Sequence, residues 1–386
     1  MLNKRFGGFS LFYRKSGIYI ICIAVLFFLI GLLTTIAPAY RLSSETISRW
    51  TSDIDSSSFL YLMGMENRGF QEAYPKEKEL PKVSTTLFHI MTNIKPSDPR
   101  SLLGQELPGF DSFGSKIIVA GEGTDYANLT LESSPPLDEV LKDRHAISGD
   151  EDEEKEVKKE EPKKAKQTTG NRKVAFIYNT HNREAFLPQM PSSTKPDEAY
   201  HKSVNISKVS ARFEKRLQEN GLGTARDNSD FMSILNKRGW GYGQSYAASR
   251  SVVEAAVSGN KDLEYIFDIH RDSLPRQHTT KTIKGKGYGQ IMFVVGADHP
   301  NYEKNLRLAT KLHYKLEEKY KGLSRGVIQK AGAGTNGIFN QDLSGNAVLV
   351  EIGGYENSLD EVYRTADVLA EVFSEYYWNA EKVNAK

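Results

Sequence analysis

Strands and helices alternate through the C-terminal half of the chain, and this alternation constrains the fold more than any other feature. Uninterrupted apolar runs of strand length are typical of strands that are covered on both faces. Runs that approach this pattern cover residues 173–178, 263–269, 290–295 and 346–350, and the second is interrupted by Glu264 and Asp268. Between and after them, apolar residues recur at helical spacing over residues 204–217, 301–320 and 358–377. This order predicts an α/β catalytic domain over residues 173–386, with a mostly parallel central sheet flanked by helices.

A charge-free apolar run near the N-terminus, residues 18–36, follows a basic stretch that contains no acid. A helix of that length spans about 30 Å, which is the thickness of the hydrocarbon core. The pattern predicts a cytoplasmic basic tail (1–16) and a transmembrane anchor (17–38), so that a single-pass protein of the cell membrane holds its catalytic domain outside the cytoplasm. A cleaved signal peptide is the alternative, because Ala37-Pro-Ala39 resembles a cleavage site.

Two further regions separate the predicted anchor from the α/β domain. Residues 40–135 combine short apolar runs with scattered prolines, which predicts a small, mainly helical membrane-proximal domain. Residues 136–172 are predicted to be a charged flexible linker. Its central stretch, residues 150–166, holds eight acids and six bases, and such a segment buries too little apolar surface to offset the entropy of ordering it.

Charge and cysteine content exclude several classes of protein. The chain has 51 Lys and Arg against 49 Asp and Glu, so its net charge of +2 gives no reason to expect a nucleic-acid partner. Its single cysteine, Cys22, rules out a disulfide-stapled scaffold. One apolar run of membrane-spanning length is too few for a multi-span transporter.

Reactive side chains follow three of the predicted strands at the point where each strand ends. His181 and Glu184 follow the first strand, His270 follows the second, and Glu351 ends the fourth. Because the carboxyl ends of parallel strands share one edge of a sheet, these side chains are expected to gather in one crevice. Imidazole nitrogens and a carboxylate are suitable ligands for zinc with an open fourth position. His181, Glu184 and His270 are therefore the candidate zinc ligands.

This set of residues predicts metal-assisted amide hydrolysis. Zinc acidifies water and polarises an amide carbonyl, and Glu351 is the carboxylate left to move protons. Asp268 precedes His270 by two residues, so it lies on the same strand face and can hydrogen-bond the imidazole. Arg271 and Asp272 are candidates to bind substrate or to pin their loop. A metallophosphatase is a weaker alternative, because it predicts more aspartate ligands and a second metal.

Four separated motifs resemble the stage II sporulation protein P family. They are Thr180-His-Asn-Arg-Glu-Ala-Phe-Leu187, Asp268-Ile-His-Arg-Asp-Ser273, Phe339-Asn-Gln-Asp-Leu-Ser344 and Val348-Leu-Val-Glu-Ile-Gly-Gly354, in that order. The resemblance implies a membrane-anchored cell-wall hydrolase that acts in engulfment of the forespore. It implies an N-acetylmuramoyl-L-alanine amidase that is also an endopeptidase on cross-linked stem peptides. Its implied fold is similar to that of zinc amidases.

The resemblance also implies roles and partners. It places zinc on His181, Glu184 and His270 and the catalytic carboxylate on Glu351. Asn340, in the third motif, joins Arg271 and Asp272 as a candidate for substrate binding. The implied partners are peptidoglycan, a lytic transglycosylase of the stage II sporulation protein D type, and a multi-pass membrane protein of the engulfment complex.

Two departures leave alternatives open. The family motif often begins with another histidine where this chain has Asn179, so Asn179 is not expected to be a ligand. In the wider amidase group the second ligand lies further along, which makes Glu198 the alternative to Glu184.

The alternative function is a non-catalytic, membrane-anchored scaffold that binds peptidoglycan. Tyr178, Tyr288 and Trp240 are candidates to stack on sugars, although core packing competes for them.

Overall fold

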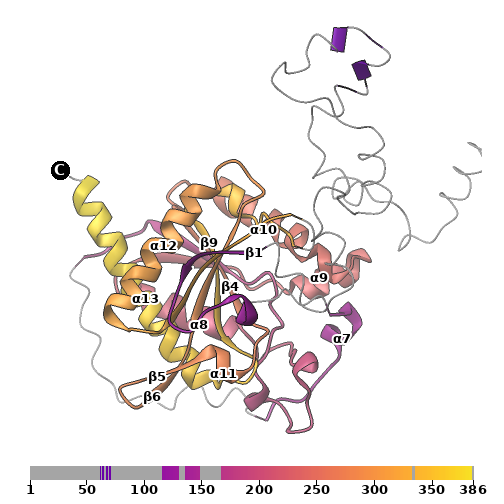
Figure 1. Cartoon of the computed structure of the whole chain (residues 1–386), viewed down its shortest axis with the longest axis vertical. Coiled ribbons are helices and arrows are strands. Elements are labelled where there is room, and N and C mark those ends of the chain that lie inside the picture. The colour runs from indigo at the N-terminus through magenta and orange to yellow at the C-terminus, as the bar shows by residue number, and fades with distance from the viewer. Residues whose placement is uncertain are drawn as a thin grey trace, which may run out of the picture. The chain divides into compact units, whose positions relative to one another are not determined.

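A computed structural model describes residues 115–129, 135–147, 167–332 and 335–384, together with positions 61, 63, 64, 67, 69 and 70. The chain divides into two compact units, Met1–Pro96 and Ser97–Lys386. All four long described ranges belong to the second unit, which is the part of the chain shown as ribbon elements with labels in Figure 1.

The described residues of the second unit form a seven-stranded sheet in the order β1–β8–β7–β9–β4–β2–β3. The pairs β2–β3, β2–β4, β4–β9 and β7–β8 are parallel, whereas β7–β9 and β1–β8 are antiparallel. The predicted mostly parallel sheet is confirmed, but the strand expected at residues 290–295 runs against its neighbour β9. The strands are β1 (Ser115–Ala120), β2 (Lys173–Tyr178), β3 (Gly223–Arg226), β4 (Tyr265–Asp272), β7 (Ile291–Gly296), β8 (Ser324–Lys330) and β9 (Ala347–Gly354).

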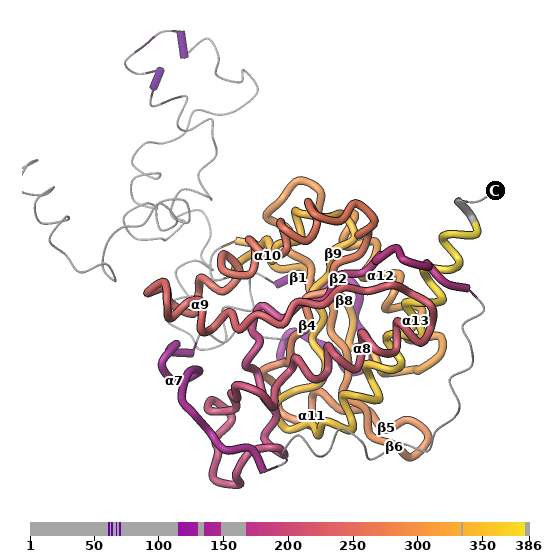
Figure 2. Tube along the Cα trace, turned by 180° about the vertical axis from the view of Figure 1, so that it is seen from behind, coloured from indigo at the N-terminus to yellow at the C-terminus, as the bar shows by residue number. Residues whose placement is uncertain are grey.

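Helices cover both faces of this sheet (Figures 1 and 2). Helices α8, α12 and α13 lie on one face, and α9 and α10 lie on the other. A small hairpin of β5 (Thr280–Ile283) and β6 (Lys286–Gly289) stands beside α13. The helices are α7 (Leu137–Leu141), α8 (Ser207–Glu219), α9 (Phe231–Arg238), α10 (Ser245–Gly259), α11 (Arg276–Thr279), α12 (Tyr302–Lys319) and α13 (Leu359–Asn384).

Alternation along the strands explains this layering. In β4, Phe267 and Ile269 pack into the core beneath α8, α12 and α13, whereas Ile266 packs on the side of α9 and α10. Successive side chains of a strand point to opposite faces, so both faces of β4 are apolar and both need a helical cover. Since His270 is four residues after Ile266, it points to the face that α9 and α10 cover.

Helix α8 shows why the periodic segments fold as predicted. Val209, Phe213 and Leu217 recur every four residues and are fully buried against the sheet. The chain then turns at Gly221, whose φ of 86° is the left-handed conformation that glycine adopts without a steric penalty. The helix indicated by the spacing over residues 204–217 is therefore present as α8.

Two segments outside residues 173–386 join this fold. Strand β1 pairs with β8 at the edge of the sheet. Helix α7 lies within residues 136–172, and its Val140 is buried in the cluster that holds Phe231 and Leu235 of α9. The α/β unit therefore begins before residue 173. A six-residue edge strand and a five-residue helix carry too few apolar positions to show a clear period. Residues 150–166, the centre of the predicted linker, lie outside the described residues.

In the described parts of the chain, no helix is both long enough and apolar enough to cross a bilayer. This finding corrects the prediction of a single-pass membrane protein with its catalytic domain outside the cytoplasm. The longest described helix, α13, mixes charged residues with its apolar stripe because it packs on a sheet. The segments on which the prediction was made, residues 1–16 and 17–38, lie outside the described residues.

A buried carboxylate joins the start of α13 to α11. Glu361 accepts hydrogen bonds from the guanidinium of Arg276, from Asn357 Nδ2 at 3.1 Å and from Ser358 N at 3.1 Å. Burial alone would raise the pKa of Glu361, but these donors outweigh it and lower the pKa from 4.5 to about 2. A carboxyl with a depressed pKa in the folded state stabilises the protein above about pH 4.5, and this stabilisation is lost as the pH falls toward 2.

We therefore expect Glu361→Gln to lower the free energy of unfolding at pH 7 by about 1–3 kcal/mol. The variant should also show a weaker loss of stability than the wild type between pH 4.5 and pH 2. Urea unfolding across this pH range measures both effects. Glu303→Gln is the matched control, because Glu303 is exposed in the first turn of α12. Equal pH dependence in Glu361→Gln and the wild type would contradict the assignment.

Candidate metal centre

The candidate site lies where three neighbouring parallel strands end. β2, β4 and β9 are adjacent in the sheet, and their register sets Tyr178 beside Asp268 and His270 beside Glu351. Residues paired in register point to the same face of a sheet. The expectation that the carboxyl ends of these strands gather the reactive side chains is therefore met by the fold.

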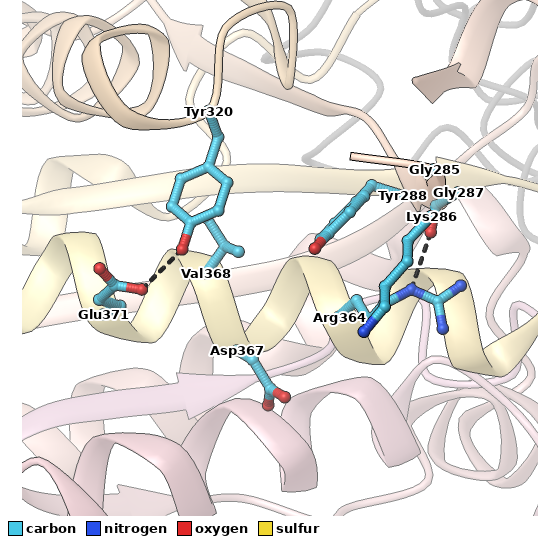
Figure 3. Close-up of a pocket in the computed structure, with 9 residues that line it drawn as sticks. All are labelled: Gly285, Lys286, Gly287, Tyr288, Tyr320, Arg364, Asp367, Val368 and Glu371. Carbon is cyan, nitrogen blue, oxygen red and sulfur yellow. Dashed lines mark hydrogen bonds between the residues drawn. The ribbon is translucent and has the colours of Figure 1, made fainter. Parts of the chain in front are cut away.

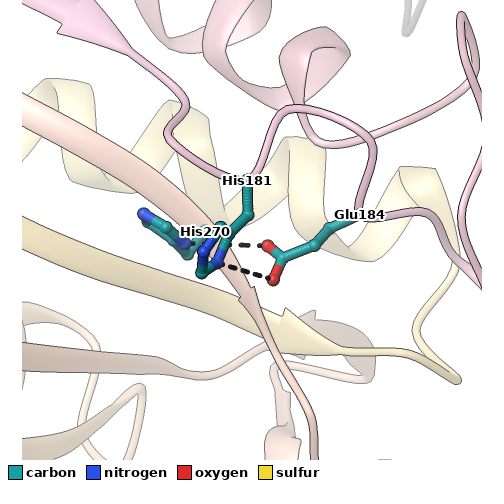
Figure 4. A group of neighbouring side chains, drawn as sticks. All are labelled: His181, Glu184 and His270. Atoms are coloured by element: carbon teal, nitrogen blue, oxygen red, sulfur yellow. Dashed lines mark ion pairs between the residues drawn. The ribbon is translucent and has the colours of Figure 1, made fainter. Parts of the chain in front are cut away.

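His181, Glu184 and His270 form a compact group, with one potential ligand atom of each residue lying within 4.8 Å of the others (Figure 4). Glu184 Oε1 lies 3.6 Å from His181 Nδ1, and Glu184 Oε2 lies 3.8 Å from His270 Nδ1. The loop after β2 brings Glu184 back toward the sheet because its N–H donates to the carbonyl of His181 at 3.1 Å. His181 and His270 are 89 positions apart in the sequence, and the pairing of β2 with β4 brings them together.

Neighbouring groups hold these three side chains in place. The N–H of Arg271 donates to Glu184 Oε2 at 2.9 Å, which orients the carboxylate. The ring of His181 stacks on Tyr242 with centroids 4.7 Å apart and meets the ring of His270 edge-on at 4.9 Å. Tyr242 lies in the 3-10 turn Tyr242–Gln244, just before α10. The start of α10 thus forms the wall behind His181.

Asp268 supports His270 from within β4. Asp268 Oδ1 lies 2.9 Å from His270 Nε2, at ion-pair distance. The carboxylate of Asp268 is fixed in turn by Thr180, whose N–H donates at 2.9 Å and whose hydroxyl donates at 2.6 Å. Asp268 and His270 are therefore in contact as predicted, but among the described residues Nε2 makes no hydrogen bond of good geometry. The contact leaves Nδ1 of His270 facing Glu184.

Glu351 is the buried cross-strand neighbour of His270. Within the described structure, its Oε2 atom has no hydrogen-bond partner. Burial raises the pKa of Glu351, and the negative charges of Asp272 and Glu184 raise it further, against the opposing effect of His270. A buried carboxyl with a raised pKa is the form of glutamate that can hold and release a proton near neutral pH.

The pKa values of Glu184 and His270 shift in opposite directions. Burial would raise the pKa of Glu184, but the neighbouring imidazoles of His181 and His270 outweigh it, so the pKa falls and Glu184 is ionised. Burial would lower the pKa of His270, but Asp268 and Glu184 outweigh it and raise the pKa. The pKa values of the two carboxylates thus shift in opposite directions, down for Glu184 and up for Glu351.

The residues present fit a zinc ion. Two imidazoles and one carboxylate form a donor set that zinc prefers, and bonds of about 2.0–2.1 Å in a tetrahedron separate ligand atoms by about 3.3 Å. The spacings of 3.6 and 3.8 Å, each to a different oxygen of Glu184, are a few tenths of an ångström longer than this value. The alternative ligand, Glu198, lies in the turn Pro196–Glu198, where its Oε2 accepts a hydrogen bond from Lys195 N at 3.0 Å. Glu198 is not part of the group, so the fold brings Glu184 to the histidines.

The three predicted substrate-binding residues are buried and contact the protein itself. The guanidinium of Arg271 donates to the carbonyl of Asp272 at 3.1 Å. The carboxylate of Asp272 accepts from Arg325. Asn340 Nδ2 donates to Ser249 Oγ at 3.0 Å and thereby fixes α10. That these residues bind substrate stays a prediction. In the structure, their hydrogen bonds hold the walls of the site.

Arg325 is a supporting residue that sequence reasoning missed. It lies in β8, is buried, and bridges the carboxylate of Asp272 to the carbonyl of Asn128 in the segment after β1. No motif marks Arg325, because its partners are 53 and 197 residues away in the sequence. Tyr242 and Tyr246, which contact the ring of His181, were missed as well; Tyr242 lies in the turn before α10 and Tyr246 in the first turn of α10.

Comparison with known proteins places the chain in a family. The family model described as stage II sporulation protein P matches residues 97–374. The chain is also 42% identical over 372 residues to the stage II sporulation protein P of Bacillus subtilis (strain 168), covering 95% of this chain and 92% of the relative. The chain belongs to the stage II sporulation protein P family. The resemblance seen in the four motifs is confirmed, and the family match begins at residue 97, where the second compact unit begins.

Solved structures similar to this family member include two N-acetylmuramyl-L-alanine amidases. The apo form from Mycobacterium abscessus is 16% identical and covers 52% of this chain and 98% of its own chain, with a TM-score of 0.30. The amidase from Mycobacterium smegmatis is 14% identical and covers 53% of this chain and 96% of its own, also with a TM-score of 0.30. Superpositions this loose carry no argument about activity.

Proposed function

We propose that this member of the stage II sporulation protein P family is a zinc-dependent peptidoglycan hydrolase. It would cleave the N-acetylmuramoyl-L-alanine amide bond, and also stem-peptide cross-links, during engulfment of the forespore. The observation that carries the proposal is the group of His181, Glu184 and His270 with the buried carboxylate of Glu351 beside His270 in register. Family membership supports the sporulation setting.

The metal would be held by His181, Glu184 and His270. When bound, zinc supplies a Lewis acid that polarises an amide carbonyl and lowers the pKa of water. Asp268 keeps the ring of His270 in place, and Tyr242 keeps the ring of His181 in place, so the ligand atoms stay aimed at one point.

Glu351 carries the proton in this proposal. Its carboxylate takes a proton from the attacking water and gives it to the amide nitrogen, which must be protonated before it leaves. Glu351 Oε2 is buried and has no hydrogen-bond partner among the described residues. Arg271, Asp272 and Asn340 remain the candidates to position substrate, directly or through the walls that they hold.

The scaffold that binds peptidoglycan without cleaving it is the competing function. A binding surface has no use for a second, protonatable carboxylate beside a ligand group, so the position of Glu351 favours the enzyme. The family resemblance further suggests that a stage II sporulation protein D-type transglycosylase and a multi-pass membrane protein of the engulfment complex act with this protein.

Mass spectrometry of digested wall tests the proposal. The purified full chain is incubated with purified peptidoglycan and zinc, and the soluble products are identified. Amidase action releases free stem peptides, whereas cross-link cleavage releases separated muropeptides with their stems attached. Absence of both products, together with co-sedimentation of the protein with the wall, would refute the hydrolase and support the scaffold.

Metal binding should also stabilise the fold. At a free zinc concentration of about 1,000 times Kd, we expect the free energy of unfolding to rise by about 4 kcal/mol, and a chelator to remove the gain. His270→Ala should bind no stoichiometric zinc and gain no such stability, because it removes a ligand. His278→Ala is the control, because His278 lies in α11 outside the group. Metal analysis and thermal unfolding give readouts that are independent of activity.

A further inference from the structure

A concave groove of about 550 Å³ lies between the β5–β6 hairpin and α13 (Figure 3). It is separate from the metal centre, because it adjoins α13 on one face of the sheet, whereas the ring of His270 lies near Tyr246 of α10 on the other. Ligand sites commonly have volumes of about 300–1,000 Å³. The polar and aromatic residues that line it are Lys286, Tyr288, Tyr320, Arg364, Asp367 and Glu371.

The wall that the hairpin contributes is held firmly on α13. Arg364 Nε donates to the carbonyl of Gly287 at 2.8 Å, and the hydroxyl of Thr365 donates to the carbonyl of Gly289 at 2.6 Å. A Cβ atom on Gly287 would lie 2.4 Å from Glu361 Oε1, so a larger residue here would have to displace the Glu361 carboxylate. The groove is therefore a preformed feature of the fold.

The acidic residues of the groove already have cationic partners. Asp367 accepts from Arg212 Nε at 2.6 Å and from Arg216 Nε at 2.9 Å. Glu371 accepts from Lys319 Nζ at 2.8 Å and from the hydroxyl of Tyr320 at 2.9 Å. These acids are consequently neutralised from outside the groove.

The basic residues of the groove, Arg364 and Lys286, have no acidic partner of this kind in the described structure. The lining holds two bases and two acids. Asp367 and Glu371 are both in ion pairs, whereas among the described residues no ion pair joins a carboxylate to Arg364 or Lys286. The two charges left without an ionic partner in the groove are therefore both positive. Because Arg364 Nε is held by the carbonyl of Gly287, its remaining N–H donors are presented in a fixed orientation. A guanidinium so presented binds a carboxylate through two parallel hydrogen bonds.

Two tyrosines complete the groove. Tyr288 and Tyr320 both stand over α13, with Val368 of the helix between them as the apolar floor (Figure 3). The guanidinium of Arg364 lies 5.8 Å from the ring centroid of Tyr288. A ligand with a carboxylate at one end and short aliphatic side chains beside it matches this arrangement of charge and rings.

We propose that the groove binds the carboxylate end of a peptidoglycan stem peptide, and so holds an uncleaved stem while the metal centre works on another. This inference rests on the proposed function for the choice of ligand. Stem peptides combine free carboxylates with alanine side chains, which matches Arg364 and Lys286 together with Tyr288 and Tyr320.

Calorimetric titration with the synthetic tetrapeptide L-Ala–γ-D-Glu–L-Lys–D-Ala tests the inference on the full chain. Arg364→Gln should raise Kd about tenfold, which corresponds to about 1.4 kcal/mol. Amidating the carboxylates of the tetrapeptide should weaken its binding to the wild type by a similar factor and should remove most of the effect of Arg364→Gln, because both changes delete the same contact. Lys286→Gln should raise Kd without touching the bond that holds the hairpin.

Two controls separate this groove from other sites. Arg307→Gln, at an exposed position of α12, should leave Kd unchanged, and His181→Ala should leave it unchanged because the metal centre is not the site that is measured. The inference is overturned if the wild type does not bind the tetrapeptide, if Arg364→Gln and Lys286→Gln both bind normally, or if His181→Ala abolishes binding. Binding that depends on Arg364 in a protein that cleaves no wall would refute the proposed hydrolase and leave this inference standing.

Discussion

Glu351→Gln should slow the hydrolysis of purified peptidoglycan by about 10²–10⁴-fold, the usual contribution of a general acid–base residue. The substitution keeps the size and shape of the side chain but removes its ability to exchange a proton. The zinc content of the variant should equal that of the wild type, because Glu351 is not in the ligand group. Release of stem peptides, measured by mass spectrometry at equal protein concentration, gives the rate.

His181→Ala is the comparison that separates proton transfer from metal binding. It should lose both zinc and activity, because it removes a member of the group of three. Glu351→Gln with normal zinc and a normal rate would show that another residue moves the proton. Loss of zinc in Glu351→Gln would instead mean that Glu351 is a metal ligand, and the division of roles between the two glutamates would be wrong.

Arg325→Met should lower the free energy of unfolding by about 3–5 kcal/mol, the usual cost of removing one partner of a buried ion pair. Arg325 and Asp272 are both almost fully buried, with side-chain exposures of 4% and 1%. Methionine fills much of the space but leaves the carboxylate of Asp272 without its cation. The carbonyl of Asn128 loses its donor as well, which frees the segment after β1. Urea unfolding measures the change.

Two further variants test the physical reason for this loss. The double substitution Arg325→Met with Asp272→Leu should recover part of the stability, because no uncompensated charge is then buried. Arg226→Met should cost only about 0–1 kcal/mol, because the pair of Arg226 and Glu214 is partly exposed. A loss below about 1 kcal/mol for Arg325→Met would show that water reaches Asp272 and that the pair is not a structural tie.

Strong periodicity made most of the fold predictable. The strand at residues 173–178 matches β2, and the helix at residues 301–320 matches α12 to within one residue at each end. β3 and β8 were missed because β3 has four residues and β8 includes Arg325 and Gln329, so neither reads as an apolar run. The direction of β7 was also missed, since an apolar run does not record which way its strand points.

Most residues of the candidate site could be predicted, because they lie at the ends of strands that the sequence indicates. His181, His270 and Glu351 follow or end apolar runs, and the rule that parallel strands share a carboxyl edge suffices to predict that they meet. Spacing along the chain did not choose between Glu184 and Glu198, because each is near the histidine in sequence. The hydrogen bond from Glu184 N to the carbonyl of His181 and the bridge between Glu184 and Tyr200 made that choice.

The local sequence pattern therefore determined which residue types lie at the edge of the sheet. Only the tertiary structure determined which of them are in contact. Strand period and helix period depend on neighbours a few positions away, so they can be read along the chain. The register that sets Glu351 beside His270, the bond from Arg325 to Asp272 and the groove under the hairpin all join segments 50 or more residues apart. Such contacts depend on how whole elements pack, and no local pattern records them.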